Sequence, residues 1–225
     1  MHILRSRVLI AAAAVACAAV ATVLVVVSSK SDASAPRALT ADEANRLAIT
    51  RFRNYETGGR AVRITVPDTA GGLTVTASVD FRSKRAYGEL RGAGRNSSSD
   101  GVIRWTPTQL SAASKTVGWT NRPLQTTGST LDTALRITLG LASDRPDNAQ
   151  LLPQNGARQL GQETINGHRT DVMLGPAARD RPDTEGTVKY WIAEDGTMYR
   201  VQLAVASEPQ PVVIDFDTQP YTPPK

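Results

Sequence analysis

The sequence predicts an α+β fold: a curved, half-open antiparallel sheet, or half-barrel, with two helices packed on its concave face. Apolar and polar residues alternate along several segments, and this period of two indicates strands with one packed face and one solvated face. Two other segments combine an N-terminal cap with apolar residues at helical spacing. Strand-like and helix-like segments do not alternate regularly, so the pattern indicates one α+β domain and not a doubly wound parallel sheet.

The composition is ordinary for a globular domain, with 225 residues of which 40% are apolar and 21% charged. Basic residues outnumber acidic ones, 26 to 21. Three of the basic residues flank an N-terminal apolar run, however, and the remainder of the chain is nearly neutral. Nucleic-acid binding needs a clustered basic face, whereas the charges here are interleaved. We therefore expect no nucleic-acid partner.

The N-terminus predicts where the protein is located. Residues 1–7 form a short basic leader, and the twenty residues from Val8 to Val27 carry no charge. Twenty helical residues can span a hydrocarbon core of about 30 Å. Because Arg5 and Arg7 precede this run, the positive-inside rule places the N-terminus in the cytoplasm and the remainder outside. We expect a single-pass membrane anchor, followed by a small polar tether at residues 28–38.

Two alternatives to an uncleaved anchor stay open. A signal peptide cleaved after residues 33–35 would release a secreted domain. Lipid attachment at Cys17 would anchor the domain instead, because Ala14 to Cys17 partly resembles a bacterial lipobox. Cys17 is the only cysteine, which excludes an intrachain disulfide and a cysteine metal site. We expect neither a metal nor a cofactor.

The folded domain is predicted to begin with a helix near Leu39. Thr40 and Glu43 have the spacing of a capping box, in which each side chain accepts a hydrogen bond from the other residue's amide. Apolar residues then recur at helical spacing until residues 58–59, a Gly-Gly pair that ends the helix. The predicted apolar face consists of Ala44, Leu47, Ala48, Phe52 and Tyr55.

Alternating strands follow this helix. Residues 82–85 predict a turn into a third strand, and residues 101–107 predict a fourth. Each strand has one apolar side, which we expect to face the helices. The apolar sets of the first two strands are Val62, Ile64 and Val66, then Leu73, Val75, Ala77, Val79 and Phe81.

A second helix is predicted from Ser129 to Ala142. Ser129 is its cap, and Asp132 stands where it completes a second capping box. Residues 211–216 predict the last strand, so the extracytoplasmic domain covers residues 39–217. The Pro-rich residues 218–225 predict a disordered tail.

Three hairpin turns are predicted in the C-terminal half. The Asn-Gly pairs at 155–156 and 166–167 favour two-residue turns, because both residues accept positive φ. A third hairpin, Thr187 to Val205, turns at Asp195-Gly196. With a two-residue turn there, the facing pairs are Ile192 with Tyr199, Tyr190 with Val201 and Val188 with Leu203, on one apolar face. Trp191 then faces Arg200 on the other side, within reach of cation–π attraction. A three-residue loop with a glycine bulge would shift the register and set Ile192 against Met198.

No segment carries a recognisable catalytic signature. His168 lies beside a predicted turn, where a solvated role is expected, and its neighbour Arg169 points to the opposite face of the strand. The carboxylates Asp183, Glu185, Glu194 and Asp195 lie in turn-like stretches, where such residues keep loops soluble. We expect no enzyme, with an unrecognised hydrolase whose carboxylates meet only in the fold left open.

Two sequence motifs near the C-terminus resemble those of the LolA-like superfamily, which includes actinobacterial cell-envelope lipoproteins. They are Trp-Ile-x-x-Asp-Gly-x-x-x-Arg at 191–200 and Val-Val-Ile-Asp-Phe at 212–216, preceded by INGHRTDVMLGP at 165–176. The order of elements from Leu39 to Phe216 is similar as well. The resemblance implies a half-open antiparallel barrel around a helical plug, with an acyl chain held between the sheet and the helices.

Three functions are compatible with these observations. The first is a membrane-anchored, extracytoplasmic domain that binds an acyl or lipid ligand and handles lipids or lipoproteins of the envelope. The second is a non-catalytic interaction or sensor domain with another envelope protein as partner, and the third is the hydrolase. For the first, the candidate lining residues are Leu73, Val75, Val79, Phe81, Tyr190, Ile192, Val201 and Leu203. The alternative for each of these residues is a place in an ordinary core.

Overall fold

The computed structural model describes residues 35–67, 71–114, 117–177, 186–205 and 209–224. These residues form one twelve-stranded sheet whose neighbouring strands are all antiparallel. The strands lie in the spatial order β1-β8-β9-β10-β11-β12-β2-β3-β4-β5-β6-β7, and the two outermost strands do not pair, so the sheet is open. The predicted antiparallel class is confirmed.

The sheet consists of two meanders that meet at its centre. Strands β2 to β7 run in order toward one edge, and strands β8 to β12 run back from the other edge until β12 pairs with β2. The first meander comprises β2 (Gly59–Val66), β3 (Leu73–Asp80), β4 (Arg85–Gly92), β5 (Gly101–Trp105), β6 (Gln109–Ala113) and β7 (Thr120–Pro123). The second comprises β8 (Arg158–Ile165), β9 (His168–Leu174), β10 (Val188–Ile192), β11 (Met198–Leu203) and β12 (Val212–Phe216), with β1 (Arg37–Ala38) paired at its edge.

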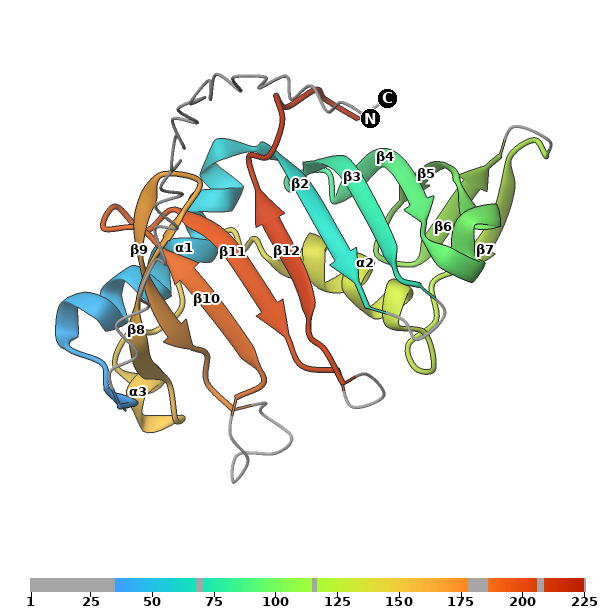
Figure 1. The fold of residues 1–225 in the computed structure, drawn as a ribbon. Coiled ribbons are helices and arrows are strands. Elements are labelled where there is room, and N and C mark those ends of the chain that lie inside the picture. Colours follow the sequence, from blue (N-terminus) through green and yellow to red (C-terminus); the bar gives the residue numbers. More distant parts are fainter. Residues whose placement is uncertain (1–34, 68–70, 115–116, 178–185, 206–208, 225) are drawn as a thin grey trace, which may run out of the picture. The chain divides into compact units, whose positions relative to one another are not determined.

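Both long helices lie on the same face of the sheet, which we call the inner face (Figure 1). The helices are α1 (Ala41–Thr57), α2 (Thr130–Gly140) and the short α3 (Leu151–Gln154), with a 3₁₀ helix η1 at Gly94–Ser99. Helix α2 buries Ala134, Leu135 and Leu139 against the central strands, in the larger of two inner cores. Helix α1 buries Leu47 and Ala48 against Met173 and Ile192, in the smaller core. The prediction of two helices against one face is therefore correct.

Helix α1 begins as predicted. The Thr40 hydroxyl accepts a hydrogen bond from the Glu43 amide, and the Glu43 carboxylate accepts one from the Thr40 amide at 2.8 Å. Arg37 of β1 also donates two hydrogen bonds to the Glu43 carboxylate, at 2.6 and 2.8 Å. The hydrogen bonds from Arg37 and from the cap lower the pKa of Glu43 to about 2. They outweigh burial, which acts in the opposite direction. The edge strand is thus tied to the start of the helix.

The buried side of α1 differs from the prediction beyond its third turn. Phe52 and Tyr55 are only partly buried, whereas Thr50 and Asn54 are buried. Asn54 takes this place because its amide donates to the Leu141 carbonyl at 2.7 Å and its oxygen accepts from Arg60 at 2.9 Å. Asn54 therefore joins the end of α1 to β2 and to the segment after α2.

The hairpin of β10 and β11 combines both registers that the sequence allows. Three pairs match the prediction for a two-residue turn: Val188 with Leu203, Tyr190 with Val201 and Trp191 with Arg200. At the turn, however, Ile192 pairs with Met198, so the predicted pair of Ile192 with Tyr199 is wrong. The Arg200 guanidinium lies 5.9 Å from the centroid of the Trp191 ring, which confirms the expected stacking.

The turn explains this mixed register. The Gly196 amide bonds to the Ala193 carbonyl and the Ala193 amide to the Thr197 carbonyl, both at 2.9 Å, which makes a three-residue loop with Gly196 at φ 84°. A β-bulge then inserts Tyr199 as an extra residue opposite Trp191 and restores the predicted pairing. The bulge keeps Met198 buried while Tyr199 stacks on His168, with ring centroids 4.2 Å apart.

The two Asn-Gly pairs have different structures. Asn166 and Gly167 have φ of 51° and 83° and form the predicted two-residue turn between Ile165 and His168. The pair at 155–156 ends α3 instead, with the Gly156 and Ala157 amides bonded back to the carbonyls of Pro153 and Leu152. The strand predicted before residue 155 is therefore a short helix.

Residues 218–224, where the sequence predicts disorder, lie along β2 and β3. The Gln219 amide donates to the Ala77 carbonyl at 3.2 Å, and the Thr222 amide donates to the Ser78 hydroxyl at 3.1 Å. Tyr221 lies directly over Gly59, where an added Cβ would approach the phenol to 2.2 Å. The Pro-rich composition does not indicate that this segment packs on the sheet, because the packing depends on Gly59, which lies far away in the sequence.

The N-terminal predictions concern residues that the structure does not describe. The predicted span Val8 to Val27 and the candidate lipidation site Cys17 both lie outside the described residues. Within the described ranges, none of the helices is both long and apolar enough to cross a membrane.

Candidate ligand-binding site

The eight predicted lining residues gather on the inner face of the sheet. Ile192 is buried in the smaller core, and Leu73 is partly buried against the larger one. Tyr190 packs against both cores, and burial raises the pKa of its phenol. The other five, fully buried in the larger core, are Val75, Val79, Phe81, Val201 and Leu203. In this structure the set packs against the protein's own side chains, and its contact with a ligand stays a prediction.

A cleft of about 530 Å³ lies beside α2. One wall is α2 itself, and the other walls come from the β3–β4 turn, the β5–β6 turn and the segment after β7. Its volume falls within the range of small-molecule sites, about 300–1,000 Å³. The lining residues are Lys84, Pro107, Thr126, Thr133, Arg136, Ile137, Leu139 and Gly140.

Leu139 connects this cleft to the predicted lining set. It lines the cleft and is also a buried member of the larger core, together with Val79 and Phe81. Ile137 is partly buried against the same core. We call Ile137 and Leu139 the apolar floor of the cleft, and the predicted residues lie in the same packed cluster as Leu139.

Three polar contacts hold α2 in place as a wall of the cleft. The Trp105 indole donates to the Leu135 carbonyl at 3.0 Å from β5. Arg122 of β7 donates two hydrogen bonds, at 2.5 and 2.6 Å, to the fully buried carboxylate of Asp132. At the other end, the Arg51 guanidinium of α1 donates to the Gly140 carbonyl at 3.3 Å.

The start of α2 differs from the predicted capping box. Ser129 accepts from the Asp132 amide as expected, but the Asp132 carboxylate bonds to Arg122 and to the Gln125 amide. Burial alone would raise the pKa of Asp132, and these hydrogen bonds outweigh it, so the pKa lies below its usual value. Asp132 thus joins the edge strand to α2.

A groove of about 670 Å³ lies where β2 ends and β3 and β12 begin. Of the eight predicted lining residues, Leu73 alone lines this groove. Its remaining walls contain prolines and glycines of the adjoining loops, including Pro67, Pro209 and Pro211. Because it does not reach α1 or α2, it is not the site between sheet and helices that the sequence predicts.

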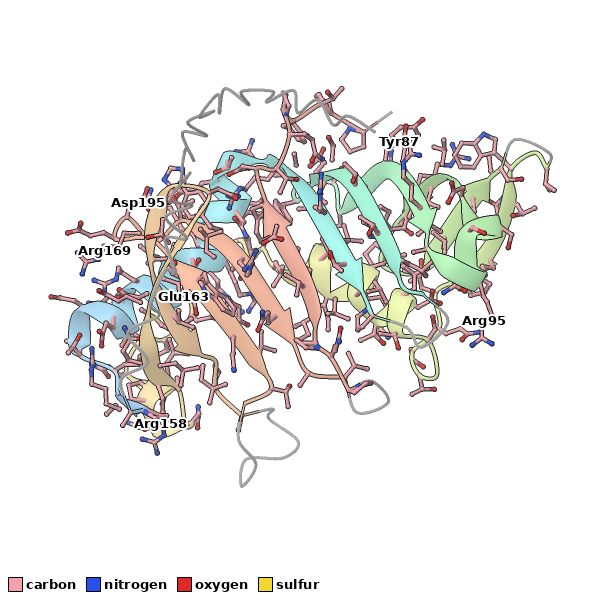
Figure 2. The ribbon with its side chains drawn as sticks, in the orientation of Figure 1. Tyr87, Arg95, Arg158, Glu163, Arg169 and Asp195 are labelled. Carbon is pink, nitrogen blue, oxygen red and sulfur yellow. The ribbon has the colours of Figure 1, made fainter. Side chains whose placement is uncertain are left out.

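A smaller polar pocket of about 270 Å³ lies between α1 and the β8–β9 hairpin. Its centre is Asp171, whose carboxylate accepts from Arg46 at 2.5 Å and from Gln162 at 2.8 Å. Arg169, labelled in Figure 2, donates to the Gln162 oxygen at 2.5 Å. These hydrogen bonds connect α1 to the β8–β9 hairpin, so we assign the groups to the joint between helix and sheet, in which the buried Arg46 Nε has no hydrogen-bond partner among the described residues.

Of the predicted polar candidates in the described part of the chain, Arg169 and Glu194 line the same polar pocket, and the others lie apart from them. His168 stacks on Tyr199, whereas Arg169 lines the polar pocket. Asp195 accepts from the Thr197 amide at 2.9 Å and so stabilises its own turn. Asp183 and Glu185 lie outside the described residues. Among the described residues, no group of three or more His, Cys, Asp or Glu side chains is placed to hold a metal ion.

Comparisons with known proteins identify no family for this chain. No family model matches the chain, and no curated protein matches it. Among solved structures, an outer membrane lipoprotein-sorting protein domain from Vibrio parahaemolyticus is 7% identical, with 79% of this chain and 92% of that chain covered, at a TM-score of 0.29. A DUF1329 family protein from Desulfovibrio piger is 9% identical, with 80% and 92% covered, also at 0.29. Such a TM-score is too low to carry a conclusion about this chain.

Sequence reasoning did not single out the residues of the α2 cleft. Lys84 was expected only as part of a turn, and Arg136 falls on the polar side of the predicted second helix. No local pattern joins them, because residues from three separate parts of the first meander and from α2 meet there. One local signal could have singled out Arg136. It has a glycine four residues later and no acidic residue three or four residues later, so the sequence offers it no ion-pair partner in the next turn of the helix.

Proposed function

We propose that the domain at residues 39–217 binds a hydrophobic acyl or lipid ligand in the bacterial cell envelope, outside the cytoplasm. The observation that carries the proposal is the cleft beside α2, with its apolar floor of Ile137 and Leu139. The placement in the envelope, and the anchor that would hold the domain there, rest on the uncharged run Val8 to Val27. The task would be handling of lipids or lipoproteins, without catalysis.

In this proposal, the open sheet acts as a half-barrel wall, and the acyl chain lies between that wall and α2. The chain would contact Pro107, Ile137 and Leu139 first. A longer chain would reach Val79 and Phe81 by displacing Leu139, which packs in the same core. The predicted lining set would then form the deep end of the site.

The test is binding of lipid to delipidated full-length protein. We expect native mass spectrometry to detect bound acyl species after incubation with an envelope lipid extract, and we expect Ile137→Trp to abolish them by filling the cleft. Leu151→Trp is the matched control, because Leu151 is 48% exposed on α3 and lies outside the cleft. Absence of acyl species, or equal binding by Ile137→Trp, would contradict the proposal.

A second candidate function, interaction with another envelope protein, is favoured by the outer face of the sheet. Tyr87 is 39% exposed and faces Arg104 of the next strand (Figure 2). The Arg104 guanidinium lies 4.5 Å from the ring centroid of Trp119, which is 46% exposed. Tyr, Trp and Arg are the residues most enriched at the energetic centres of protein interfaces.

Photo-crosslinking in cells tests this second function. A crosslinker at position 87 should recover one specific envelope protein, and the additional substitution Trp119→Ser should reduce the yield. The same crosslinker at the exposed Arg158 is the control, because Arg158 lies far from Tyr87 on the sheet (Figure 2). Equal recovery from both positions would mean that the contact is unspecific.

A further inference from the structure

We propose that the α2 cleft selects amphiphiles with an anionic head, a phosphate or a carboxylate, which Lys84 and Arg136 bind at its rim. This inference rests on the proposed function and adds the class of its ligand. The cleft joins two cationic side chains to an apolar floor, and none of its eight lining residues is acidic. A single site with these two properties matches a molecule that has an anion at one end and a hydrocarbon chain at the other.

Arg136 is exposed and has no partner on its own helix. The residue four positions earlier is Asp132, a natural partner by spacing, but its buried carboxylate already accepts two hydrogen bonds from Arg122. The residue four positions later is Gly140, which has no side chain. Within the described residues, Arg136 forms no ion pair or hydrogen bond through its side chain. Its guanidinium is therefore available to a ligand.

Lys84 reaches the same cleft from the β3–β4 turn. It is exposed, and its backbone has φ 52°, the left-handed region, at the tip of the turn. Asp80, the nearest carboxylate along the chain, accepts hydrogen bonds from the amides of Arg82 and Ser83 instead. Like Arg136, Lys84 has no side-chain partner among the residues that the structure describes.

Neighbouring arginines behave differently. Arg82 donates to the Glu56 carbonyl at 2.8 Å, and Arg51 donates to the Gly140 carbonyl at 3.3 Å. These two side chains cap carbonyls at the C-terminal ends of α1 and α2 and so offset the negative potential of both helix ends, of which the α2 end lines the cleft through Gly140. The anion would therefore meet two free cations, while the helix ends that would repel it are already capped.

Three probes distinguish the contribution of the head group to the affinity from that of the hydrocarbon chain. Dodecyl phosphate carries both, dodecanol carries the chain alone, and inorganic phosphate carries the anion alone. Dissociation constants are measured by calorimetry on the full-length protein in a fixed concentration of non-ionic detergent, with each probe below its critical micelle concentration. We expect dodecyl phosphate to bind about tenfold more tightly than dodecanol, a ratio equivalent to about one charge-assisted hydrogen bond, and inorganic phosphate to bind most weakly.

The variant Lys84→Asn/Arg136→Gln should remove this preference and leave the affinity for dodecanol unchanged. Asn is chosen at position 84 because it tolerates positive φ. The control Arg95→Gln/Arg158→Gln loses the same two charges at exposed positions outside the cleft, at opposite ends of the sheet (Figure 2), and should keep the preference. Loss of the preference in this control would assign it to the overall charge of the protein and overturn the inference.

The other outcomes separate this inference from the proposed function. If dodecanol binds the unmodified protein as tightly as dodecyl phosphate, the selection of anions is wrong and the hydrophobic site stands. If inorganic phosphate binds as tightly as dodecyl phosphate, the site takes a free anion, and both the inference and the acyl site lose their basis. If none of the three probes binds, the proposed function fails together with the inference.

Discussion

Replacement of Trp105 by alanine is expected to lower the free energy of unfolding by about 3–5 kcal/mol, the usual cost of removing a buried aromatic side chain. Trp105 is 1% exposed on the inner face of β5, and its indole donates to the Leu135 carbonyl of α2. The change therefore leaves a cavity under α2 and removes a contact that holds this helix. The measurement is urea unfolding followed by circular dichroism, with the midpoint and slope fitted together.

The matched control is Trp119→Ala. Trp119 is 46% exposed and lies beside the exposed Arg104, so its loss should cost less than about 1 kcal/mol. Trp105→Phe should lie between the two variants, because it keeps most of the volume and loses the hydrogen bond. A cost below about 1 kcal/mol for Trp105→Ala would mean that α2 is not held by this residue.

The second large effect is expected at the joint between β7 and α2. Arg122→Met keeps the apolar stem of the side chain but leaves the Asp132 carboxylate, which is fully buried, without its cation. Removing one partner of a buried ion pair costs about 3–5 kcal/mol, and the 45% exposure of the Arg122 side chain reduces our expectation to about 2–3 kcal/mol at pH 7. Urea unfolding at pH 7 checks this value.

The loss should shrink as the pH falls. In the unmodified protein the pKa of Asp132 is lowered, so this carboxylate stabilises the fold above its unfolded pKa, and the contribution disappears as the pH falls through the folded pKa. In Arg122→Met, burial should prevail and raise the pKa of Asp132 above about 3.9, so the carboxylate destabilises the fold at neutral pH. Below the lowered pKa of Asp132 in the unmodified protein, both folded proteins hold a neutral carboxyl, and the two unfolding free energies should converge.

The control for this prediction is Arg91→Met. Arg91 pairs with Glu89 on the outer face, and the two side chains are 71% and 60% exposed. Its loss should change the unfolding free energy by less than about 0.5 kcal/mol at any pH. An Arg122→Met effect as small as this, or one that grows toward acid pH, would contradict the assigned role of the buried pair.

Some features of this fold are predictable because the interactions that decide them are local. The Thr40 and Glu43 box needs only four consecutive residues, and it begins α1 as expected. The period of two in β2 and β3 indicates which side chains are buried, because a shift by one residue would expose the apolar set. The pairing of Trp191 with Arg200 follows from the same alternation.

Other features depend on partners that lie far away in the sequence. The β10–β11 turn has one more residue than predicted, and the bulge at Tyr199 that compensates for it is favoured by stacking on His168 of another hairpin. The two Asn-Gly pairs are identical as dipeptides, yet one ends a helix of only four residues, too short to show a helical period. The Asp132 carboxylate does not form the predicted capping bond, because it accepts hydrogen bonds from Arg122 of the edge strand β7 instead.

The sequence by itself determined the class of the fold, the two helices, most of the strands and the side of each strand that is buried. These depend on backbone preferences and on a periodicity that a few neighbouring residues express. The tertiary structure alone decided the order of the strands, the pairing of β12 with β2 and the cleft beside α2. Lys84 and Arg136 are 52 positions apart in the chain and share this cleft only because a turn of the sheet and a helix pack side by side.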